Sequence, residues 1–186
     1  MKSIQIVKNL TTLLLAMMAL SVLSFADSAK EIESDANKAL QKFYHEVPGG
    51  KKFLNQAKGY VIFPDINEAG FFFGGKYGEG VLRIQGKTKS YHSITAASVG
   101  MQMGLQNYSL IIAFTSDKAL KDFILDDNDW ETDMQTKIIM ADWTTGKDAD
   151  EIDYGTSMIG FAFDNTGMMG KFSMEGTKFE EINPDD

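Results

Sequence analysis

The chain has 186 residues, 44% of them apolar and 24% charged, which is the composition of one globular domain with a buried core. It carries 18 Lys and Arg against 26 Asp and Glu, a net charge of −8, and this argues against nucleic-acid binding because a polyphosphate backbone needs a basic partner. The absence of cysteine excludes disulfides, thiolate metal sites and cysteine nucleophiles.

Residues 1–26 have the pattern of a secretory signal peptide. They contain no acid, place Lys2 and Lys8 before an apolar run over residues 10–23, and end in the small-x-small sequence Ser24-Phe25-Ala26. The apolar run is shorter than the roughly 20 residues that span a bilayer. We therefore expect cleavage before Asp27 and export to the periplasm, the cell envelope or the medium. Cleavage leaves 16 bases against 26 acids, a net charge of −10.

Residues 29–47 have the periodicity of an amphipathic helix. At 100° per residue, the apolar side chains fall on one narrow arc: Ile32, Ala36, Leu40, Phe43 and Val47. Pro48-Gly49-Gly50 ends this helix, and a short second helix is expected over residues 51–57. Because the polar face mixes Lys with Glu and Asp, the pattern favours a helix packed on the body over one lying on a membrane.

After Gly59 the apolar period changes from 3.6 to 2, which predicts strands. Short strands are expected over residues 60–63, ended by Pro64, and over residues 71–73 and 81–84. Residues 99–107 alternate between Met or Leu and Gly or Gln, as one half-buried strand does. The apolar run 110–114 predicts a strand covered on both faces, and residues 116–124 a helix capped by Ser116 or Asp117.

The last third predicts an acidic loop followed by further antiparallel strands. The loop covers residues 126–133, and the strands cover residues 159–163, 168–175 and 177–182. The fold class expected from these elements is α+β. It consists of an antiparallel β-rich body, either a sheet or a partly closed barrel, with the N-terminal amphipathic helix packed on it.

Three sequence patterns that suggest specific chemistry are incomplete. The glycine-rich run 74–80 is followed by strand-like residues instead of a helix, so it predicts a bulged or tightly bent strand pair and not a phosphate loop. The acids of residues 127–133 lack the glycine and the final acid of a calcium loop. A serine hydrolase would need the fold to bring His92 to Ser157, and no pattern requires this. We expect no catalytic residue, no metal and no cofactor.

Several motifs taken together resemble one known family. They are Ala57-Lys58-Gly59 leading to Phe63-Pro64, Ala69-Gly70-Phe71, the run Gly100-Met101-Gln102-Met103-Gly104-Leu105-Gln106, and Glu175-Gly176-Thr177. The combination is similar to the SYLF family, the lipid-binding or actin-regulator domain of yeast and animal endocytic proteins, and in particular to its secreted bacterial branch. The resemblance makes residues 27–186 a single SYLF-like domain. It implies an α+β fold, no known catalytic residues and, in eukaryotic members, binding to phosphoinositide-containing membranes.

We therefore expect a non-enzymatic envelope protein that binds an anionic phospholipid or a phosphoinositide-like head group. The alternative is a structural or interaction module that binds another envelope protein and no lipid. A net charge of −10 repels an anionic surface unless bases cluster. The candidate lipid contacts are Lys51, Lys52, Lys58, Arg83, Lys87 and Lys89, and the candidate recognition face is Gly100, Gln102, Gly104 and Gln106.

Overall fold

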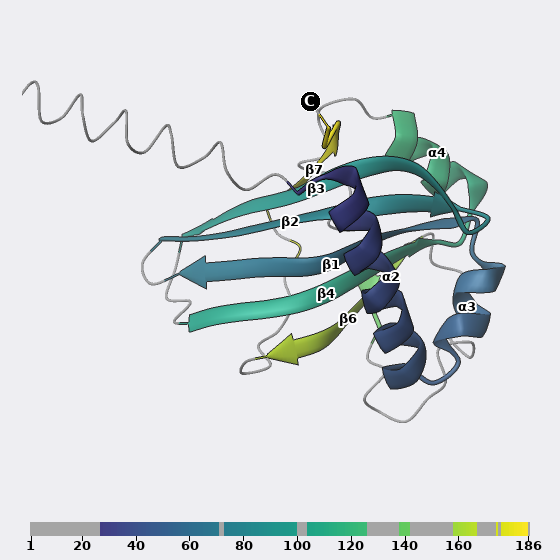
Figure 1. Cartoon of the computed structure of the whole chain (residues 1–186), viewed down its shortest axis with the longest axis horizontal. Coiled ribbons are helices and arrows are strands. Elements are labelled where there is room, and N and C mark those ends of the chain that lie inside the picture. The colour runs from purple at the N-terminus through teal and green to yellow at the C-terminus, as the bar shows by residue number, and fades with distance from the viewer. Residues whose placement is uncertain are drawn as a thin grey trace, which may run out of the picture.

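The computed structural model describes residues 27–70, 73–99, 104–125, 138–141, 158–166, 174 and 176–185. Its helices are α2 (Ala29–Glu46), α3 (Gly50–Gln56) and α4 (Asp117–Leu125). Its strands are β1 (Gly59–Gly70), β2 (Phe73–Ile84), β3 (Lys87–Val99), β4 (Gly104–Phe114), β5 (Ile138–Met140), β6 (Met158–Thr166) and β7 (Thr177–Ile182). They form one curled sheet in the order β5-β6-β4-β1-β2-β3-β7, antiparallel except for the β5–β6 pair, with α2 across one face (Figure 1). The predicted fold class is confirmed.

Helix α2 forms where the sequence predicts it. Ser28 caps its N-terminus in a reciprocal capping box with Glu31, which satisfies backbone donors that the first turn leaves unpaired. The predicted apolar residues are all buried, and Ala39 joins them. Near the other end of the helix, Lys42 forms an ion pair with Asp164 of β6, and the Glu46 carboxylate accepts the Asp164 backbone N–H at 3.2 Å. Helix α2 is therefore fixed to the sheet by both apolar and polar contacts.

The sheet buries side chains on both of its faces. On one face, Phe43 of α2 and Phe53 of α3 pack edge-on against Phe161 of β6, with ring centroids 5.3 and 5.2 Å apart. On the other face, the tilted rings of Phe123 in α4 and Phe114 in β4 have their centroids 4.9 Å apart. The two hydrophobic cores share strands β1, β2, β4 and β6, whose successive residues point to opposite faces. Among the described residues, no helix combines the length and the apolar character that crossing a bilayer requires.

Strand β1 does not end at Pro64, and this corrects the predicted boundary. It continues to Gly70, and its register shifts beside Pro64 against both neighbouring strands. Proline has no N–H to give to the ladder, so a bulge accommodates it inside the strand. The Ser109 hydroxyl of β4 donates to the Pro64 carbonyl at 2.6 Å. This side-chain bond gives the Pro64 carbonyl a partner at the bulge.

The glycine-rich run belongs to a single long strand, β2, and does not separate two short strands. It pairs along its length with β1 and β3. A Cβ on Gly80 would lie 2.2 Å from the Ile62 carbonyl oxygen, and one on Gly78 would lie 2.8 Å from the Asp65 carbonyl oxygen. The glycines thus permit the backbones of β1 and β2 to approach closely.

The alternating residues 99–107 are not one strand. Val99 ends β3 and Gly104 begins β4, and strands β2 and β1 lie between these two in the sheet. Helix α4 and strands β4, β6 and β7 agree with the sequence to within a few residues, but β5 and most of β3 were not predicted. The inward positions of β3 carry polar as well as apolar side chains, so its period is hard to see in the sequence. The predicted acidic loop 126–133 and most of the predicted strand 168–175 lie outside the described residues.

We expect Gly80→Ala to destabilise the protein by about 3 kcal/mol, because its methyl group would overlap backbone atoms that cannot move away without breaking the β1–β2 ladder. Gly75→Ala is the control, since its Cβ would meet the nearest atom, the Ala96 carbonyl oxygen, only at 3.4 Å. Urea denaturation compares the two variants. Equal midpoints would contradict the close approach at Gly80.

Candidate functional site

The six predicted contact bases lie around one end of the sheet. Four strands meet there, namely the starts of β1 and β3 and the ends of β2 and β4. Tyr60 pairs with Arg83, and Ile84 pairs with Lys87. The Lys58 N–H donates to the Phe114 carbonyl at 2.8 Å. Helix α3, which carries Lys51 and Lys52, leads directly into this end, and α4 leaves it (Figure 1). Bases that are distant in sequence are therefore collected on one side of the molecule.

Five of these bases are exposed lysines, and α4 adds two more. Lys51, Lys52, Lys58, Lys87 and Lys89 are exposed, and so are Lys118 and Lys121 of α4. The sequence analysis missed the α4 lysines because they look like the solvent side of an ordinary amphipathic helix. These seven lysines are called the lysine end below. Two acids of α4 moderate its charge: Asp117 lies 3.7 Å from the Lys58 ammonium, and Asp122 pairs with Lys118.

An open groove of about 530 Å³ lies between the last turn of α2 and α3, beside the lysine end. The residues with polar side chains that line it are Tyr44, Lys51, Lys52, Asn55 and Gln56. The Lys51 ammonium lies 5.7 Å from the centre of the Tyr44 ring, within reach of a cation–π interaction. Burial raises the pKa of Tyr44, so its phenol stays neutral at physiological pH. This combination of cations and amide donors suits a polar anion.

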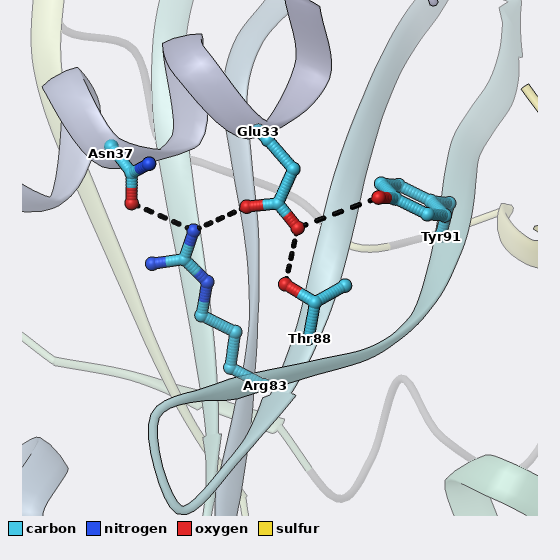
Figure 2. A network of polar contacts seen from close by, with 5 residues as sticks. All are labelled: Glu33, Asn37, Arg83, Thr88 and Tyr91. Atoms are coloured by element: carbon cyan, nitrogen blue, oxygen red, sulfur yellow. Dashed lines mark hydrogen bonds and ion pairs between the residues drawn. The ribbon is translucent and has the colours of Figure 1, made fainter. Parts of the chain in front are cut away.

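Arg83 differs from the lysines because its side chain is almost completely buried, with 6% exposed. Its guanidinium donates from Nη2 to Glu33 Oε2 and to Asn37 Oδ1 of α2, both at 2.8 Å (Figure 2). The second Glu33 oxygen accepts hydrogen bonds from the hydroxyls of Thr88 and Tyr91 on β3. The network of Arg83 and Glu33 therefore ties α2 to β2 and β3, and a membrane contact through Arg83 would first have to break it.

His92 lies in the interior of the protein. Its Nε2 is 2.8 Å from the Ser90 hydroxyl, and its ring lies 4.8 Å from the ring of Phe123. Burial lowers the pKa of His92 to about 4, so the imidazole is neutral at pH 7. Ser157, its partner in the hydrolase hypothesis, lies outside the described residues. Within the described part of the chain, no three His, Asp or Glu side chains are grouped as a metal ion would need, and the acids at 127–133 fall outside it.

The predicted recognition face is described only in part. Gly104 and Gln106 lie in β4 and pair with Gly70 and Glu68 of β1, whereas Gly100 and Gln102 are outside the described residues. These pairs are at the opposite end of β1 and β4 from the Gly59–Phe114 pair, which borders the lysine end. The two surfaces expected from the sequence are therefore separated by the length of the sheet.

These features define a small α+β protein with a helix-covered sheet and a basic sheet end. Residues 95–185, about half of the chain, match the family model described as "Ysc84: Las17-binding protein actin regulator". This is the SYLF family, so the resemblance seen in the sequence is confirmed, with residues 95–185 as the matched region. The family is linked to lipid binding and actin regulation. No curated protein matched the chain.

We expect Arg83→Met to cost about 3 kcal/mol, because it leaves the Glu33 carboxylate half-buried without its ionic partner. Lys87→Met removes an exposed base from the neighbouring strand and should change the free energy of unfolding by no more than about 0.5 kcal/mol. Chemical denaturation of both variants tests this. A loss at Lys87 as large as that at Arg83 would refute the structural role of the network.

The buried His92 should make the protein sensitive to acid. Its pKa is lower in the folded state, about 4, than the unfolded value of about 6.5. The stabilisation from keeping it neutral is thus fully present above pH 6.5 and is lost as the pH falls towards 4, by about 3 kcal/mol in total. His92→Gln should flatten this part of a plot of thermal midpoint against pH. His45→Gln, which removes an exposed imidazole at the end of α2, is the matched control for the loss of one imidazole.

Proposed function

We propose that this protein is a non-enzymatic lipid-binding protein of the bacterial cell envelope. In this proposal, it binds the anionic head groups of phospholipids, or phosphoinositide-like head groups, through the lysine end. The observation that carries the proposal is the gathering of seven lysines, from α3, β3, α4 and the segment before β1, at one end of a molecule whose net charge is negative. Export rests on the signal-peptide pattern of residues 1–26.

The electrostatics favour a contact made by this end of the molecule alone. A base near an anionic membrane contributes about 1 kcal/mol, and an acid opposes binding by a comparable amount. Charges more than about 8 Å from the membrane are largely screened at physiological ionic strength. Asp117 and Asp122 offset two of the seven lysines, so among the described residues the local balance is basic although the whole chain is acidic. The protein is then attracted to an anionic membrane when its lysine end faces the membrane, and repelled in other orientations.

The groove beside α3 offers a place for a single head group within this contact. Lys51 and Lys52 supply charge, and the Asn55 and Gln56 amides supply hydrogen-bond donors for phosphate oxygens or sugar hydroxyls. The family's link to lipid binding supports a ligand of this class. Contact with actin or with a Las17-like partner is not part of the proposal, because an exported protein would not meet cytoplasmic partners.

Vesicle flotation tests this function. The protein should float with vesicles rich in anionic phospholipid at low salt and stay behind with neutral vesicles. Lys51→Glu combined with Lys52→Glu replaces two attractions by two repulsions, about 4 kcal/mol in all. The affinity for anionic vesicles should therefore fall at least a hundredfold. Lys30→Glu combined with Lys38→Glu, on the exposed side of α2, makes the same change in net charge and should retain most of the binding.

The proposal fails if the unchanged protein does not float with anionic vesicles at low salt, or if the two double variants behave alike. Crosslinking in the envelope followed by mass spectrometry would then address the alternative. A dominant adduct with one envelope protein would favour an interaction module that binds no lipid.

A further inference from the structure

The segment just before α2 contacts a buried carboxylate. The backbone nitrogen of Asp27 donates to Glu79 Oε2 of β2 at 3.0 Å. Glu79 is only 8% exposed, and the Tyr77 hydroxyl donates to its other carboxylate oxygen. The Glu79 carboxylate is therefore held in place by its neighbour in β2 and directed at the nitrogen of one particular residue.

The surroundings of this contact are acidic. The pKa of the Asp27 side-chain carboxyl is raised, first by burial and then by nearby carboxylates. These carboxylates belong to three elements: Glu79 of β2, Glu31 and Asp35 of α2, and Asp65 of β1. Near the C-terminus of the chain, Asp185 accepts the Ala29 N–H at 3.3 Å. A positive charge placed at the Asp27 nitrogen would thus be stabilised by carboxylates of α2, β1 and β2.

Asp27 is also the residue at which the sequence predicts that the mature chain begins. We propose that Glu79 is the receptor for the α-amino group that signal-peptide cleavage creates at Asp27, and that their ion pair fastens the mature N-terminus to β2. This rests on the export that the proposed function assumes. Hydrolysis adds water across the Ala26–Asp27 peptide bond, leaving a carboxylate on Ala26 and an amine on Asp27. With an ordinary pKa of about 8, this amine takes up a proton at neutral pH.

Cleavage therefore changes the nature of the bond to Glu79. In the precursor the donor is a neutral peptide N–H, whereas in the mature protein it is an ammonium group facing the same carboxylate. Hydrogen bonds between charged groups are roughly twice as strong as neutral ones. Because Glu79 is buried and α2 follows directly after Asp27, processing would strengthen the hold of this contact on the first turn of α2.

The test follows the α-amine of the exported protein. The full precursor is expressed in an exporting bacterium, the first residue of the purified product is read by mass spectrometry, and the ¹³C-methylated α-amine is titrated by NMR. We expect Asp27 to be the first residue and its amine to titrate about one pKa unit higher than in Glu79→Gln, a tenfold difference in proton affinity. Asp65→Asn removes a nearby carboxylate that does not contact the Asp27 nitrogen, and should produce a much smaller change.

Two further measurements guard against a fold effect of Glu79→Gln. A glycine inserted between Ala26 and Asp27 moves the ammonium one residue away, leaves Glu79 intact, and should also abolish the raised pKa. Since the pKa of the amine is raised on folding, the stabilisation is complete below about pH 8 and is lost as the pH rises through the folded value. The thermal midpoint of the unchanged protein should therefore fall over this range, and that of Glu79→Gln should not.

An N-terminus at another residue, or an α-amine that titrates alike in the unchanged protein and in Glu79→Gln, overturns the proposal. These outcomes are distinct from failure of lipid binding, which is read by vesicle flotation and depends on Lys51 and Lys52. An unprocessed product beginning at Met1 would remove the premise of export from both proposals.

Discussion

The structure depends on a sheet whose central strands are apolar on both faces. Residues 60–63 of β1 and 110–114 of β4 are buried throughout, so water must be excluded from each side. Helices α2 and α3 cover one face and α4 covers the other. Helices α3 and α4 border the same sheet end, because α3 leads into β1 and α4 follows β4. The basic surface is therefore a by-product of covering both faces of the sheet: the exposed sides of these helices bring their lysines to one place.

How far the sequence predicts this fold depends on how local the determining interactions are. Helix α2 was predicted almost to the residue, because its period, its cap and its terminating Pro48-Gly49-Gly50 all lie within the segment itself. The limits of β1 and β2 were wrong because they depend on neighbours. Pro64 fits within β1 only through a bulge relative to β2 and β4, and the glycines of β2 are needed where the backbone of β1 comes close.

The candidate site was predictable as a set of bases but not as a surface. Counting charges identified Lys51, Lys52, Lys58, Arg83, Lys87 and Lys89 as the local excess of bases. Composition could not distinguish Arg83 from its neighbours, because its burial depends on Glu33 and Asn37, which are 50 and 46 residues away. The contribution of α4 depends on where the end of β4 lies in the sheet. Sequence reasoning therefore identified the charge but not its arrangement.

Helix α2 has a mechanical consequence for the whole molecule. Its Glu33 is bound to Arg83 of β2, and its Lys42 and Glu46 are bound to Asp164 of β6, so one rigid rod is anchored to two strands between which β1 and β4 lie. A helix fixed at two points across a curved sheet limits how far that sheet can flatten. If it were released, Phe161 and Phe163 would face water on an open sheet, the kind of surface through which chains associate. By keeping this apolar face covered, α2 thus protects the protein against self-association.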